Sequence, residues 1–84
     1  MEDAIKNLGE YLDNVYNNHA RWKIGKNINP TMGEVTQLYD VYKYIVKDKV
    51  NPCEITTISQ NVADALKYFG FKVKTQGVGW VIAE

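Results

Sequence analysis

The sequence has very few of the residues that bind metals or form disulfides. Its 84 residues include one cysteine, Cys53, and one histidine, His19. A single cysteine cannot close an internal disulfide, and one cysteine with one histidine does not provide the ligand spacing of a zinc site. A catalytic pair would need an orienting carboxamide or a glycine-rich oxyanion loop beside it, and the sequence shows neither pattern. We therefore expect no metal site, no other cofactor and no enzyme activity.

Long apolar runs are also missing. No stretch approaches the roughly 20 residues that a membrane-spanning helix needs. The first residues include Glu2 and Asp3 and lack the basic start and apolar centre of a signal peptide. We expect a cytoplasmic protein without a membrane partner.

The chain carries no excess of one charge, because ten Lys and Arg residues balance ten Asp and Glu residues. Strong nonspecific binding to nucleic acid depends on neutralising many phosphates, so a neutral total disfavours it. The balance is uneven along the chain. Residues 1–20 carry four acidic residues against Lys6, and residues 21–50 carry six basic against three acidic residues. Local basic patches are therefore compatible with the neutral total.

The remaining composition suits one small globular domain spanning 1–84. The chain is 45% hydrophobic and 24% charged, in the ordinary globular range, and it is shorter than two separate cores would need. Many Asn, Lys, Tyr and Ile residues are typical of an AT-rich genome. We expect a protein of a low-GC bacterium, its phage or another mobile element.

Two amphipathic helices are predicted in the first half. Apolar residues recur at helical spacing in residues 3–18, at Ile5, Leu8, Leu12, Val15 and Tyr16. Gly9 weakens this helix, and a close packing partner would explain it. A capping box of Thr31 and Glu34 begins the second helix, whose apolar side is Val35, Leu38, Tyr39, Tyr42, Ile45 and Val46. Pro52 follows its predicted end near Lys47 or Asp48. Between the helices, the alternation in residues 21–25 predicts a short strand with Trp22 and Ile24 inward.

The last 28 residues predict a third helix followed by a hairpin. Thr57 and Gln60 form a second potential capping box, and Ile58, Val62, Ala65, Leu66 and Phe69 then recur on one side. Gly70 suits a helix end, where left-handed dihedrals are common. The period then changes to two: Phe71 and Val73 point one way, Lys72 and Lys74 the other. Residues 75–79 supply a turn, and Trp80 and Ile82 alternate along a second strand.

The predicted order is helix, strand, helix, helix, strand, strand. The fold class is therefore α+β, with three helices and a small antiparallel sheet. This pattern resembles the winged-helix (winged helix-turn-helix) family over nearly the whole chain. One departure is that residues 49–56 separate the second and third helices, where the family usually has a turn of three or four residues.

The resemblance implies DNA binding by a transcription regulator or a replication accessory factor. In that family the third helix commonly reads bases in the major groove and the hairpin contacts the backbone. The corresponding residues here are Ser59, Gln60, Asn61 and Asp64 for bases, and Lys67, Lys72, Lys74 and Gln76 for phosphate and backbone. The alternatives are a solvated helix face and lysines that protect a sheet edge.

A second basic segment surrounds Trp22, with Arg21, Lys23 and Lys26 beside it. Such a pattern could stack a base and hold phosphates. The alternative is that Trp22 belongs to the core and packs against Trp80, which leaves the cations simply outside.

The rival hypothesis is a protein-binding module, such as an inhibitor or adaptor of a host or replication enzyme. Tyr44 and Tyr68 lie off the apolar sides of the predicted helices. Tyrosine is enriched at interfaces because it combines a large contact area with a polar tip. These two residues are the interface candidates, and the partner is another protein or a second copy of this chain.

Overall fold

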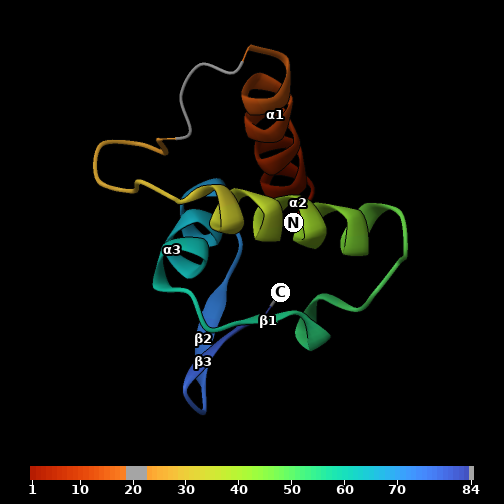
Figure 1. Ribbon diagram of the computed structural model, residues 1–84. Coiled ribbons are helices and arrows are strands. Elements are labelled where there is room, and N and C mark those ends of the chain that lie inside the picture. The colour runs from red at the N-terminus through yellow and green to blue at the C-terminus, as the bar shows by residue number, and fades with distance from the viewer. Residues whose placement is uncertain (19–22, 84) are drawn as a thin grey trace.

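The computed structural model describes residues 1–18 and 23–83 of the chain. Within them lie three helices, one short 3-10 helix and one three-stranded antiparallel sheet (Figure 1). The order is α1 (Glu2–Asn18), α2 (Met32–Val46), η1 (Pro52–Glu54), β1 (Thr56–Thr57), α3 (Gln60–Phe69), β2 (Val73–Gln76) and β3 (Gly79–Ile82). The predicted α+β class, with three helices and a small antiparallel sheet, is confirmed.

Local signals explain most helix boundaries. The capping box that begins α2 is present: the Glu34 N–H donates to the Thr31 hydroxyl oxygen, and the Thr31 N–H donates to the Glu34 carboxylate. At the end of α3, Gly70 adopts a left-handed φ of 119°, as predicted. The start of α3 differs from the prediction. Ser59, rather than Thr57, is its N-cap, because its hydroxyl accepts from the Val62 N–H at 3.2 Å.

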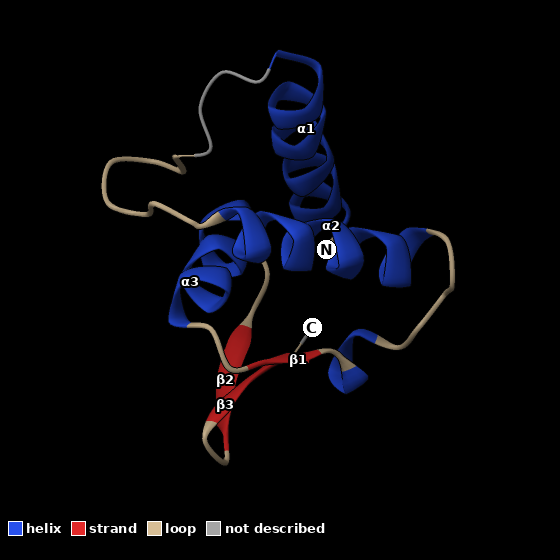
Figure 2. Cartoon of the chain, in the orientation of Figure 1, coloured by secondary structure: helices blue, strands red, loops and turns tan. Residues whose placement is uncertain are grey.

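The sheet has the order β1-β3-β2, with the hairpin of β2 and β3 projecting away from the helices (Figure 2). Its third strand, β1, comes from the connection between α2 and α3, and the described residues 23–25 of the predicted strand are not part of this sheet. In that earlier segment the described residues hold an isolated bridge between Ile24 and Ile28. The Arg21 and Trp22 part of the predicted strand lies outside the described residues. The hairpin turn is also tighter than predicted, since only Gly77 and Val78 separate β2 from β3.

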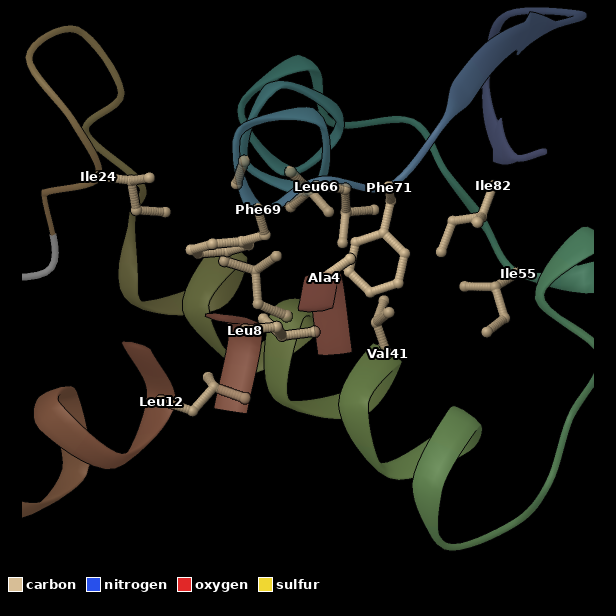
Figure 3. Packing of buried hydrophobic residues seen from close by; sticks show 13 residues of the cluster. Ala4, Leu8, Leu12, Ile24, Val41, Ile55, Leu66, Phe69, Phe71 and Ile82 are labelled. Atoms are coloured by element: carbon tan, nitrogen blue, oxygen red, sulfur yellow. The ribbon is translucent and has the colours of Figure 1, made fainter. Parts of the chain in front are cut away.

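The core lies where the three helices meet the base of the hairpin (Figure 3). α1 packs against both α2 and α3. Phe71 points its ring toward Ala4 of α1 and Val41 of α2. The predicted close partner of Gly9 is Tyr42, because a Cβ added at Gly9 would lie 3.0 Å from the Tyr42 ring. Gly9 thus lowers the helix propensity of α1 but allows α1 to pack closely on α2.

Several residues that the helical patterns assigned to the core are on the surface. They are Tyr16, Tyr39, Val46 and Ile58. Tyr16, Tyr39 and Val46 lie at the edges of their apolar stripes, where a small rotation of the helix exposes a side chain. Ile58 is exposed for a different reason: it precedes the cap of α3 and is not in the helix.

Candidate functional site

The polar start of α3, which was predicted to read bases, is joined to α2 by one carboxylate. The Ser59 hydroxyl donates to Glu34 Oε2 at 2.6 Å, and the Asn61 amide donates to Glu34 Oε1 at 3.1 Å. The Thr31 N–H also donates to Oε1, at 2.8 Å. Glu34 therefore satisfies donors at the first turns of both α2 and α3 and fixes their relative position.

These bonds change the acidity of Glu34. They lower the pKa of its carboxyl from 4.5 to about 2, with the Ser59 hydroxyl as the largest cause, followed by the Thr31 N–H and the Asn61 amide. A hydrogen bond that stabilises the charged carboxylate lowers its pKa in this way. The lowered pKa extends the charged state of Glu34 to more acidic pH. At neutral pH the carboxylate is negative with or without this shift, and its charge beside the start of α3 disfavours the approach of phosphate.

The predicted base-reading residues differ in their accessibility. Gln60 is exposed, whereas Ser59, Asn61 and Asp64 are half-buried, and two of these three are bonded to Glu34. Lys67 is exposed further along α3. Base reading by this group stays a prediction, and Gln60 is the member most accessible to a ligand.

The other candidates for phosphate and backbone contact lie in two separate places along the fold. Lys72, Lys74 and Gln76 are exposed on the hairpin. Lys26 is exposed in the turn that the Ile24–Ile28 bridge closes, and Lys23 is exposed just before this bridge. Arg21 is outside the described residues. A Cβ added at Gly25 would lie 3.0 Å from the Tyr68 ring, so this turn packs against α3.

Beside the hairpin, three apolar side chains border a groove of about 440 Å³, which we call the hairpin groove. Ile58 is 79% exposed and Val78 is 93% exposed, while Trp80, the third apolar residue of the lining, is half-buried. Its remaining lining residues are uncharged: Gln37, Thr56, Thr57, Gln76 and Gly79. The described part of the chain thus presents an uncharged recess beside the hairpin, in which three apolar side chains stand among polar ones.

Two local features build this groove. Gly79 lets the backbone at the end of β1 approach β3 closely, because a Cβ there would meet the Thr57 carbonyl oxygen closer than real contacts allow. The Thr57 hydroxyl then donates to the Gln37 side chain at 3.0 Å and ties the groove wall to α2. The sequence offered one signal for this site, the β-branched pair Thr56 and Thr57 before Ser59, which suits a strand followed by a helix cap.

Tyr44 and Tyr68 are both exposed, as the helical patterns predicted. Tyr44 lines a second groove of about 360 Å³, together with Asp40, Val50 and Glu54. Tyr68 contacts Phe69 edge-on and lies against Gly25. The two tyrosines therefore belong to different surroundings and do not form one site.

The remaining candidates for chemistry are not assembled in the described residues. Cys53 is exposed, its thiol 3.7 Å from the Ala83 carbonyl oxygen, and His19 lies outside the described range. Residues 1–18 and 23–83 contain no cluster of three or more potential metal ligands. They also contain no helix with the length and apolar character needed to span a membrane.

A comparison with protein-family models, curated proteins and solved structures finds no significant match. Function therefore has to be argued from the surface of this molecule.

Proposed function

We propose that this protein is a protein-binding module, which docks a partner through the hairpin groove. The observation that carries the proposal is the exposure of Ile58 and Val78 in a groove that Trp80 also lines. Burial of apolar surface stabilises a fold or a complex by roughly 25 cal/mol per Å². The exposed side chains of Ile58 and Val78 do not contribute in this way to the fold, so a partner that covers them would gain this free energy. Aromatic residues surrounded by apolar neighbours are common anchors of interfaces.

The charge of the groove favours a protein over a nucleic acid. Side chains alternate between the two faces of a strand, and cross-strand partners share a face. Trp80 pairs with Thr75, whereas Lys74 pairs with Val81. Trp80 and Lys74 therefore lie on opposite faces of the hairpin. A base stacked on Trp80 would not have the Lys74 cation on its own side, so an uncharged, apolar protein surface suits the groove better.

Such a module would act as an inhibitor or adaptor of a host or replication enzyme, and we propose that it acts in the cytoplasm. Site-specific photo-crosslinking tests the proposal in cells that express the gene. A photoreactive amino acid at Val78 should capture one discrete protein, and the same group at Lys47, an exposed cap of α2, should not. Ile58→Asp should abolish the capture. Equal capture from both positions, or capture that survives Ile58→Asp, would contradict docking in the groove.

A second candidate function, DNA binding, is favoured by the exposure of Lys72 and Lys74 on the projecting hairpin. If the winged-helix resemblance reflects function, these lysines hold the backbone while Gln60 reaches the bases. Their replacement by alanine should weaken binding to all sequences and flatten its salt dependence, by about 0.9 in the logarithmic slope for each phosphate that is no longer neutralised. The absence of any DNA binding at about 50 mM salt, where screening is weak, would eliminate this candidate.

A further inference from the structure

A third groove is lined by residues of α1 and α2. α1 lies on the side of α2 away from the hairpin (Figure 2). The groove has a volume of about 610 Å³, and we call it the tyrosine cradle. Its lining consists of Gly9, Leu12, Asp13, Tyr16, Tyr39 and Tyr42. Three of these six residues are tyrosines, and they come from both helices. The fold therefore brings together aromatic rings that are far apart in the sequence.

The rings of the cradle are fixed and still accessible. Tyr16 and Tyr39 meet edge to face, with ring centroids 5.7 Å apart and planes at 74°. They are nevertheless 49% and 46% exposed. Tyr42 is half-buried and lies against α1 where Gly9 has no side chain. An edge-to-face pair presents a ring face, with its negative quadrupole, to a neighbouring ligand.

The negative charge of the cradle favours a positively charged ligand. Asp13 is the one charged residue that the described chain contributes to the lining, and the Asn17 amide donates to its Oδ1 at 3.2 Å. α1 as a whole carries four acidic residues against Lys6. A carboxylate beside tyrosine faces attracts a cation through both the ion pair and the ring quadrupole.

We propose that the tyrosine cradle binds an arginine side chain of a partner protein. A guanidinium is planar, so it can stack on a tyrosine ring while its edge donates to the Asp13 carboxylate. The lysine ammonium, a compact and strongly hydrated point charge, gains less from this arrangement. The proposal uses a surface separate from the hairpin groove and stands without it.

A titration with N-acetylarginine methylamide, followed by NMR of the tyrosine ring protons, tests the proposal on the unmodified protein. We expect saturable shifts at Tyr16, Tyr39 and Tyr42, with Tyr44 unmoved as an internal control. The lysine analogue should bind more weakly. The citrulline analogue has the shape of arginine without its charge and should produce no saturable shift.

Asp13→Asn should weaken arginine binding by about threefold, in line with the loss of an exposed charge pair. Asp40→Asn is the matched control, because it makes the same change in a residue that lines the Tyr44 groove instead. It should leave the affinity unchanged. The proposal is overturned by citrulline binding as well as arginine, by equal effects of the two variants, or by shifts that stay linear into the tens-of-millimolar range.

Discussion

At the scale of single residues, Glu34 determines how the second and third helices meet. Its contact with Thr31 is local, three residues apart, and the sequence predicted it from the capping-box pattern. Its bonds to Ser59 and Asn61 join residues 25 and 27 positions apart. A helical or strand period does not predict contacts between residues so far apart. From the sequence, Ser59 and Asn61 were therefore predicted to be on an exposed polar side of the third helix.

The lowered pKa of Glu34 predicts a loss of stability in acid. The folded protein has a pKa of about 2 at this carboxyl, below the ordinary 4.5, so the folded state holds the proton less tightly than the unfolded state. The resulting stabilisation is fully present above pH 4.5 and is lost as the pH falls toward 2. With allowance for solvent screening it amounts to about 1 kcal/mol. Urea unfolding at a series of pH values measures it. Glu34→Gln should lose this component of the acid dependence, and an unchanged profile in that variant would contradict the assignment.

Asn61 gives a prediction that separates structure from DNA reading. Asn61→Ala removes the amide that bonds to Glu34, so the free energy of unfolding should fall by about 1 kcal/mol. Gln60→Ala changes an exposed neighbour and should alter stability by less than about 0.5 kcal/mol. Thermal melting compares the two. Equal melting temperatures would show that the Asn61 bond contributes nothing to the fold.

At the scale of elements, the sequence predicted the three helices and the hairpin, because each contains enough residues to show a period. The strand β1 has only two residues, Thr56–Thr57, too few for any alternation to appear. It forms because β3 offers a partner and Gly79 leaves room for it. Ile58 is exposed because it follows β1 and precedes α3. Since β1 was not predicted from the sequence, the hairpin groove beside it was not predicted either.

A substitution at Gly79 tests the close approach of the β1 backbone to β3. Gly79→Ala places a methyl group against the Thr57 carbonyl and should destabilise the protein by about 1 to 3 kcal/mol. Gly33→Ala is the control: its added methyl would lie 3.9 Å from Thr31 Oγ1, and the better helix propensity should leave α2 as stable or more so. Calorimetry of both variants measures the difference. A Gly79→Ala protein that melts at no lower temperature than the unmodified chain would rule out the close approach of β1 to β3.

Trp80 tests how far the core extends along the hairpin. The alternation of β3 predicted a core Trp80 beside Trp22, but Trp80 is half-buried at the groove, and Trp22 lies outside the described residues. Trp80→Ala should therefore cost about 1 to 2 kcal/mol and keep cooperative unfolding. Ile82→Ala, on the same face and 1% exposed, should cost about 2 to 5 kcal/mol. A larger loss for Trp80→Ala than for Ile82→Ala would place Trp80 in the core instead.

At the scale of the whole molecule, the fold forms the hairpin groove and the tyrosine cradle on separate surfaces. The sequence gives the positions of their residues along the chain but does not show that these residues come together. The hairpin, β1 and one residue of α2 line the hairpin groove, whereas α1 and α2 line the tyrosine cradle. The hairpin and α1 lie on opposite sides of α2 (Figure 2). The exposed Tyr44 and Tyr68 were predictable because they lie off helical stripes. The grooves were not, since each joins residues from elements whose relative position depends on tertiary packing.

The most direct test of the central claim is the affinity of the partner captured at the hairpin groove, measured by calorimetry for the unmodified chain and two variants. Val78→Ala removes exposed apolar surface at the groove, and Lys74→Ala removes a cation from the opposite face of the hairpin. We predict a loss of about tenfold or more, roughly 1.4 kcal/mol, for Val78→Ala and less than about twofold for Lys74→Ala. The opposite order, with Lys74→Ala the more damaging change, would contradict docking in the groove.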